Sequence, residues 1–303
     1  MKVGNLSDRQ LATSLSNEGL RIKTGPFVFS IQSDIAEVRE GIALLHGETP
    51  LAREDDYTDY YIAIRNGRLL RRWLRPQACF EVDGVTPFKP LPRSQAFPML
   101  EWGMNWCITA YGHHQLVLHA AVIARGDFAA ILPAPPGSGK STLCAALINR
   151  GWRLLSDELA LVDLETGQIE PLARPVNLKN ASIDIMRAYA PEAVFSRPVE
   201  DTTKDTVALM RAPAESVVQA HVPATPRWVI LPRYTPGADA DLQPMAQGEA
   251  LIALAENAMN YHVLGARGFA AVGRLIDGCR AYRFSYSRLD DAIRVFDDLA
   301  SAL

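Results

Sequence analysis

One segment limits what this chain can fold into more than any other, because it places an apolar run, a glycine-rich turn and a helical pattern in direct succession. The apolar run is FAAILPAP (128–135), and the helical pattern is STLCAALINR (141–150). Between them, Gly137 and Gly139 allow backbone N–H groups to approach phosphate oxygens, and the N-terminus of a helix favours bound anions. Strand, turn and helix in this order are the context of a P-loop, so the sequence predicts an α/β fold with a nucleotide-binding core.

The residue types in this turn fit ATP with Mg²⁺. Lys140 is expected to place a cation at the β- and γ-phosphates, and the Ser141 hydroxyl to ligate Mg²⁺. The predicted nucleotide-binding residues are Pro136, Gly137, Ser138, Gly139, Lys140, Ser141 and Thr142. The usual pattern begins with a glycine, whereas this chain has Ala134 there, and alanine adopts a positive φ only at a cost.

ABC ATPases, GTPases and small-molecule kinases all share such a turn. The chain has neither an LSGGQ-like signature nor an NKxD motif, which disfavours the first two classes. A net charge of −3, from 31 basic and 34 acidic residues, disfavours a nucleic-acid binder. We see no secretory leader, no membrane-spanning run and no CxxC pair among the four cysteines, so we expect a cytoplasmic protein with reduced thiols and no membrane partner.

Two adjacent acids follow the helical pattern, within the strand-like run 152–163. Asp157 comes 16 residues after Ser141 (157 − 141) and is followed by Glu158. Neighbouring strand residues point to opposite faces, so both acids reach one point only if the strand bends. Either one acid activates a hydroxyl or water while the other holds Mg²⁺, or both are solvated at a strand end. His119 lies on an apolar run, where a lone histidine is more often a core residue.

The order of His119, PPGSGKST and RLLSDE resembles the HPr kinase/phosphorylase superfamily. The strings EWGMNWC (101–107), PPGSGKSTLCAALINRGWRLLSDELAL (135–161) and NLKNASI (177–183) resemble more specifically the branch called HprK-related kinase A. The resemblance implies an HPr kinase/PEP carboxykinase-like core. It also implies that Asp157 takes the proton of the acceptor serine, that His119 contacts this acid, and that Glu158 with Ser141 holds the metal. A further metal-binding glutamate of the superfamily has no clear counterpart in 165–185.

These features lead us to expect an ATP-dependent kinase that phosphorylates a serine or threonine of a peptide or small protein. Its expected catalytic residues are Asp157, His119 and Lys140. The resemblance implies a peptide-modification system, with a PqqD-like chaperone as a candidate partner and a homo-oligomer as a candidate assembly. Two alternatives stay open, a small-molecule kinase and a non-catalytic ATP-binding module. The second is kept open by Ala134 and by the missing glutamate.

The chain is expected to divide into an N-terminal α+β domain (1–110) that docks the substrate and a catalytic domain (111–303). We expect a hairpin at 60–75 around Asn66-Gly67, long functional loops over 171–215 with a short helix near 183–190, and a final strand–helix region. Only 6 of the 31 basic residues are lysines, which singles out Lys179 and Lys204, the latter as part of a lid. Arg174 and Arg211 are weaker candidates. The cluster Arg65, Arg68, Arg71, Arg72 and Arg75 is either a solvated face or a dock for an acidic peptide.

Overall fold

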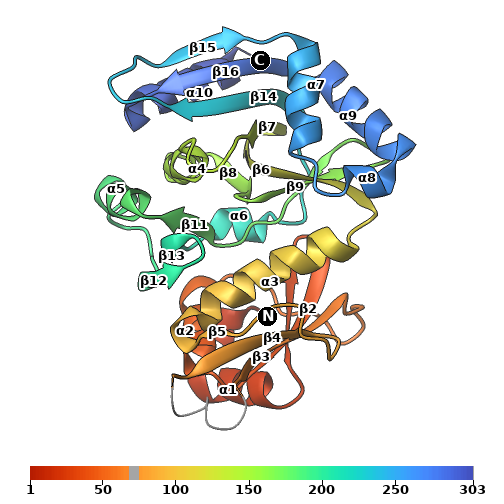
Figure 1. Ribbon diagram of the computed structural model, residues 1–303, viewed down its shortest axis with the longest axis vertical. Coiled ribbons are helices and arrows are strands. Elements are labelled where there is room, and N and C mark those ends of the chain that lie inside the picture. The colour runs from red at the N-terminus through yellow and green to blue at the C-terminus, as the bar shows by residue number, and fades with distance from the viewer. Residues whose placement is uncertain (68–74, 303) are drawn as a thin grey trace.

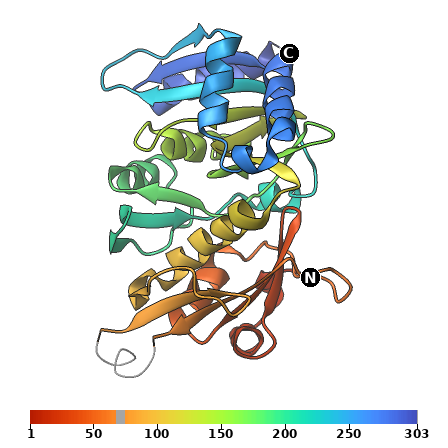
Figure 2. The same ribbon diagram turned by 45° about the vertical axis from the view of Figure 1, so that its right-hand side comes forward.

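The computed structural model describes residues 1–67 and 75–302 and has a mixed α/β architecture with three sheets (Figures 1 and 2). The N-terminal part is built on a five-stranded sheet in the order β1-β2-β3-β4-β5. Its strands are β1 (Leu20–Thr24), β2 (Phe27–Ser33), β3 (Tyr60–Asn66), β4 (Gln77–Val82) and β5 (Leu91–Pro92). Short 3-10 turns at Val3–Asn5 and Arg93–Gln95 accompany α1 (Asp8–Ser16), α2 (Ala36–Leu45) and α3 (Ala96–Tyr111).

The second part is built on an eight-stranded sheet in the order β10-β9-β6-β7-β14-β16-β15, with β8 paired to β6. Its strands are β6 (Gln115–Arg125), β7 (Phe128–Pro133), β8 (Arg153–Ser156), β9 (Leu159–Asp163), β10 (Ile169–Glu170), β14 (Thr225–Tyr234), β15 (Asp241–Pro244) and β16 (Arg280–Tyr286). Its helices are α4 (Lys140–Ile148), α7 (Gln247–Glu256), α8 (Tyr261–Leu264), α9 (Ala266–Gly278) and α10 (Leu289–Ser301).

The central strands of this sheet are buried on both faces. On β6, Ala121 and Ile123 join a core that α4 and α10 cover, whereas Val122 and Ala124 join the opposite core under α7 and α9. A strand covered on both faces is apolar at every position rather than at alternate ones. This explains why 115–124 and 128–133 appear in the sequence as continuous apolar runs, and the strands expected there are confirmed.

Residues 171–215 contain more regular structure than the sequence predicted. They form a three-stranded sheet in the order β11-β13-β12, made of β11 (Val176–Lys179), β12 (Val199–Thr202) and β13 (Asp205–Met210), with helices α5 (Ala181–Tyr189) and α6 (Ala214–Val218). The expected helix is α5, but the expectation of long loops was wrong. The strands have four to six residues and pair across a distance in sequence, Val176 with Met210, so no local periodicity reveals them.

The second run of the hairpin expected at 60–75 around Asn66-Gly67 lies outside the described residues apart from Arg75, and the antiparallel partner of β3 is β4 rather than that run. Both edges of β3 are occupied, by β2 in parallel and by β4 in antiparallel orientation, and Asn66 lies opposite Ala78. Arg68, Arg71 and Arg72 of the predicted arginine cluster lie outside the described residues. Arg65 is held within the sheet, where it donates to Gln32.

Helix α3 connects the two parts and lies between the N-terminal sheet and the β11–β13 sheet (Figure 1). Its apolar side belongs to the N-terminal core, through Met104, Cys107 and Ile108, and this core is continuous with Val117 and Leu209 of the second part. None of the four cysteines, all of which lie in the described part of the chain, forms a disulfide bond. None of the helices in the described ranges combines the length and apolar character needed to cross a membrane.

Candidate functional site

The glycine-rich turn lies between the end of β7 at Pro133 and the start of α4 at Lys140. Gly137 and Gly139 have φ values of +85° and +87°, a conformation that favours glycine. The ends of two neighbouring strands hold the turn, because the Tyr234 N–H donates to Ser138 O at 2.8 Å and the Tyr286 hydroxyl donates to Gly139 O at 3.0 Å. Ala134 is buried and does not have a positive φ, so alanine there is free of the strain that the sequence pattern suggested.

We expect alanine at 139 to be more destabilising than alanine at 137. Both substitutions force alanine into a left-handed conformation, at about 1–2 kcal/mol. A Cβ at 137 would meet nothing within 4 Å, whereas a Cβ at 139 would lie 2.6 Å from the Tyr286 hydroxyl. That clash is expected to add roughly 1–3 kcal/mol to the cost of Gly139→Ala. Urea unfolding of both variants measures the difference, and equal losses would contradict the close packing around Gly139.

Lys140, the first residue of α4, is 8% exposed and lies against His119 of β6, with 3.3 Å between Nζ and His119 Nε2. Burial, together with the nearby Lys140 ammonium, lowers the pKa of His119 to about 4, so the ring is neutral at pH 7 and Nε2 accepts the hydrogen bond. The resemblance implied that His119 contacts the catalytic acid. Among the described residues, its side chain is hydrogen bonded to Lys140 and not to Asp157, because His119 lies opposite Leu159, beyond the acids.

Asp157 occupies the break between β8 and β9, which divides the single strand expected over 152–163. It is 5% exposed; Oδ2 accepts the Asn177 N–H at 3.1 Å, and Oδ1 is buried without a partner. Burial and the charge of Glu158 raise the pKa of Asp157 to about 6, against the opposing effects of Lys140, the Asn177 N–H and the Ser141 hydroxyl. The result is an ionised carboxylate at neutral pH with one free oxygen, which is what a general base requires.

Glu158 differs from its neighbour because both of its oxygens are occupied. Oε2 accepts from Asn105 Nδ2 at 2.5 Å, and Oε1 accepts from Lys204 Nζ at 3.2 Å and from Asn177 Nδ2 at 3.4 Å. Burial alone would raise the pKa of Glu158, but the Lys204 ammonium and its hydrogen bond outweigh burial and lower it. The two carboxyl groups therefore have pKa values displaced in opposite directions, which is common where acids have distinct roles.

Lys204 lies in the turn between β12 and β13 and reaches the acids from the small sheet. Its ammonium is also 5.2 Å from the centre of the Trp102 ring on α3. Lys179, at the end of β11, has a pKa lowered by burial and by the charge of Lys204. Arg211 is not part of the site around the two acids, because its guanidinium donates to Leu44 O at the end of α2. Thr142 is hydrogen bonded to Ser182 of α5 at 2.8 Å.

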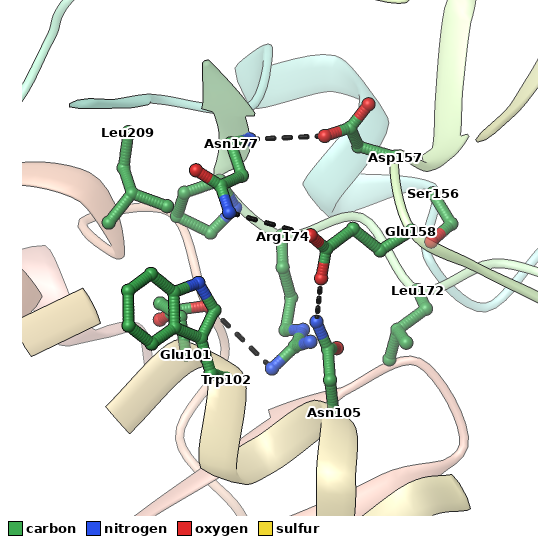
Figure 3. A pocket seen from close by; sticks show the side chains of 11 residues that line it. Glu101, Trp102, Asn105, Ser156, Asp157, Glu158, Leu172, Arg174, Asn177 and Leu209 are labelled. Atoms are coloured by element: carbon green, nitrogen blue, oxygen red, sulfur yellow. Dashed lines mark hydrogen bonds and ion pairs between the residues drawn. The ribbon is translucent and has the colours of Figure 1, made fainter. Parts of the chain in front are cut away.

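A narrow pocket adjoins the two acids, between α3 and the strands of the second part (Figure 3). Its volume is about 20 Å³, which is room for about one water-sized group. Sequence reasoning did not identify Trp102, Asn105 or Asn177, although the strings EWGMNWC and NLKNASI contain them. The lining residues are Glu101, Trp102, Asn105, Ser156, Asp157, Glu158, Leu172, Arg174, Pro175, Asn177 and Leu209.

No family model matches the sequence, and no curated protein matches it. Among solved structures, the HPr(Ser) kinase/phosphatase from Coxiella burnetii matches with 12% sequence identity and a TM-score of 0.29. The match covers 62% of this chain and 99% of that one. A TM-score this low does not establish a shared fold, so we base the function on the residues of the site itself.

Proposed function

We propose that the protein is an ATP-dependent kinase that transfers the γ-phosphoryl group to a serine or threonine hydroxyl of a peptide or small protein. The observation that supports this most directly is Asp157, a buried carboxylate with one free oxygen close to the Ser141 hydroxyl at the start of α4. A glycine-rich turn at the start of a helix, a buried lysine and an available base within one site are the parts that phosphoryl transfer needs.

In this proposal the turn and Lys140 bind the triphosphate. The backbone N–H groups of 137–142 and the N-terminus of α4 face the phosphate oxygens, and the Lys140 ammonium leaves His119 for the γ-phosphate. Asp157 accepts the proton of the incoming hydroxyl while the hydroxyl oxygen attacks the γ-phosphorus. The bond between the γ-phosphorus and the bridging oxygen breaks, and that oxygen leaves with the β-phosphate. Because His119 is neutral, Lys140 is the positively charged side chain nearest to the transferred phosphoryl group.

The site has donor atoms that suit Mg²⁺. Mg²⁺ takes oxygen ligands and is usually held by one or two protein groups together with phosphates. The Ser141 hydroxyl is such an oxygen, and Glu158 becomes available as a second ligand only if Lys204 releases Oε1. Bound there, the ion would neutralise charge on the phosphate oxygens. The free Oδ1 of Asp157 is left for the proton of the acceptor hydroxyl. In the described ranges, no group of three or more histidine, cysteine or acidic side chains forms a metal site by itself.

The activity is expected to fall as the pH is lowered through about 6. The pKa of Asp157 is raised to about 6, so the base form predominates above this pH and is replaced by the protonated form below it. The kcat/KM should therefore be constant above pH 7 and fall about tenfold per pH unit well below 6. A profile measured from pH 5 to pH 8 that stays level at the acidic end would contradict Asp157 as the base.

Purified protein with γ-labelled ATP tests the function itself. Label transferred to peptides or small proteins supports the proposal, and label transferred only to small hydroxyl compounds favours the small-molecule kinase. ATP binding without turnover on any acceptor favours the non-catalytic module. Peptide modification and a PqqD-like partner are supported by the sequence resemblance alone, and co-purification of the full chain with such a partner tests them.

A further inference from the structure

The pocket beside the acids concentrates the unsatisfied hydrogen-bonding groups of the protein. Nine buried side-chain atoms in the described part of the chain have no hydrogen-bond partner, and five of them belong to residues that line this one pocket. These five are Trp102 Nε1, Asp157 Oδ1, Arg174 Nε, Arg174 Nη1 and Asn177 Oδ1. Buried polar groups are nearly always paired, so a cluster of unpaired ones indicates a ligand that pairs them.

The most unusual of these groups is the guanidinium of Arg174, which is 7% exposed. Its closest charged partner is Glu101, at 3.6 Å from Nη1 to Oε2, which is too long for a hydrogen bond. Glu101 is held from its other side by His46, at 2.7 Å. Arg174 therefore keeps its charge compensated by Glu101 while at least two of its N–H donors, at Nε and Nη1, remain free.

The free groups have a definite pattern of donors and acceptors. Three N–H donors, from Trp102 and Arg174, suit a carbonyl oxygen. The Asn177 amide nitrogen faces Glu158, which leaves Oδ1 as an acceptor that suits an N–H group. In Figure 3, the free oxygen of Asp157 points away from Trp102 and Arg174. A hydroxyl at Asp157 and an amide group deeper in the pocket would thus engage separate sets of atoms.

The charge of the pocket selects against an anion. Glu101, Asp157 and Glu158 place three carboxylates on its wall, where Arg174 is the cation, while Lys204, Lys140 and Lys179 lie outside the wall and face Glu158 and Asp157. A ligand carboxylate beside Arg174 would therefore meet the carboxylate of Glu101, which already compensates the Arg174 charge, and like charges brought together at a binding site are costly. A neutral amide carbonyl uses the same donors without this cost.

We infer that this pocket is a subsite for the main-chain amide beside the reacting hydroxyl, with Trp102 and Arg174 donating to its carbonyl oxygen and Asn177 accepting from its N–H. The inference rests on the proposed kinase function and limits the class of acceptor that the kinase takes. The subsite takes the amide on the carboxyl side of the acceptor serine or threonine, so an acceptor with a free carboxylate there is discriminated against. The pocket volume of about 20 Å³ gives room for about one water-sized group, which fits the carbonyl oxygen.

Two matched probes test the subsite. N-acetyl-L-serine N-methylamide has amides on both sides of the serine, and N-acetyl-L-serine has a carboxylate on one side. The protein with ¹⁵N-labelled tryptophans, bound to Mg²⁺ and a non-hydrolysable ATP analogue, is titrated with each probe at pH 8. The indole N–H signal of Trp102 is identified by its loss in Trp102→Phe. We expect the amide probe to move this signal downfield, and the carboxylate probe to need at least about tenfold higher concentration.

Kinetics with the same probes provide the second measurement. Trp102→Phe removes one N–H donor and should lower kcat/KM for the amide probe about two- to tenfold without changing the KM for ATP. Trp106→Phe is the matched control, because Trp106 lies one turn along α3 and packs on Phe88 and Tyr111 outside the pocket. Arg174→Lys keeps the charge beside Glu101 but removes the planar set of donors, and should reduce the preference for the amide probe.

The two proposals fail in different ways. If the ATP analogue does not bind in these samples, the kinase function is wrong. If it binds and the Trp102 signal stays in place with the amide probe, or if the carboxylate probe moves it equally well, the subsite is wrong.

Discussion

Replacing Asp157 by asparagine is expected to abolish phosphoryl transfer while ATP binding is retained. Asn177 can still donate to the side-chain oxygen, but no carboxylate remains to accept the proton of the hydroxyl. Loss of a general base lowers kcat by about 10²–10⁴-fold. Transfer from γ-labelled ATP and binding of a fluorescent ATP analogue, measured on the same preparation, separate the two effects. Glu165→Gln, an exposed acid in the turn after β9, is the control.

The same substitution is expected to stabilise the protein in the absence of nucleotide. The pKa of Asp157 is raised from 3.8 to about 6, so its ionisation disfavours the folded state at pH values above this range. Asparagine removes this effect, and the gain should be of the order of 1–3 kcal/mol at pH 8 and smaller at pH 5. A variant that loses transfer and also loses stability at pH 8 would indicate a structural role for Asp157.

Replacing Lys140 by alanine is expected to weaken ATP binding by about 10- to 100-fold, because a hydrogen bond to a charged group contributes about 1.5–3 kcal/mol. The substitution removes the ammonium that lies between His119 and the acids. Without this cation, the pKa of Asp157 should rise further, so any residual activity should have its acidic limb above pH 6. Titration with the fluorescent analogue measures the affinity, and the pH profile measures the second effect.

Lys23→Ala serves as the control for this experiment, since Lys23 is exposed on β1 in the N-terminal sheet. An ATP affinity for Lys140→Ala within threefold of the control would contradict phosphate binding at the turn between β7 and α4. Such a result would leave the buried lysine as a structural partner of His119 and the two acids.

The sequence was informative where local pattern determines structure. The strand, turn and helix around Gly137 to Ser141 follow from glycine chemistry and from runs that are apolar on both faces. The burial of Asp157 did not follow, because adjacent acids at a strand end fit a solvated pair as well. The sequence was uninformative where contacts come from distant segments. Asn105 and Trp102 of α3 and Lys204 of the turn between β12 and β13 reach Glu158 or its surroundings only after folding, and no spacing rule connects segments that far apart.

The contact between His119 and Lys140 could not be predicted either, for a related reason. Its position on an apolar strand fits a core histidine as well as a functional one, and only the start of α4 beside β6 makes Lys140 its partner. The β11–β13 sheet illustrates the same limit, because its pairing depends on register between segments about thirty residues apart.

Helix α3 gives the protein a way to make activity depend on correct folding of its first hundred residues. The apolar side of the helix is fixed by Met104 and Ile108 in the N-terminal core, and Asn105, about 100° around the helix from Met104, donates to Glu158. A shift of one residue would turn the helix by about 100° and withdraw that amide from the carboxylate. In the proposed kinase, a newly made chain with a misassembled N-terminal core would thus lack the Asn105 contact that positions Glu158 beside Asp157.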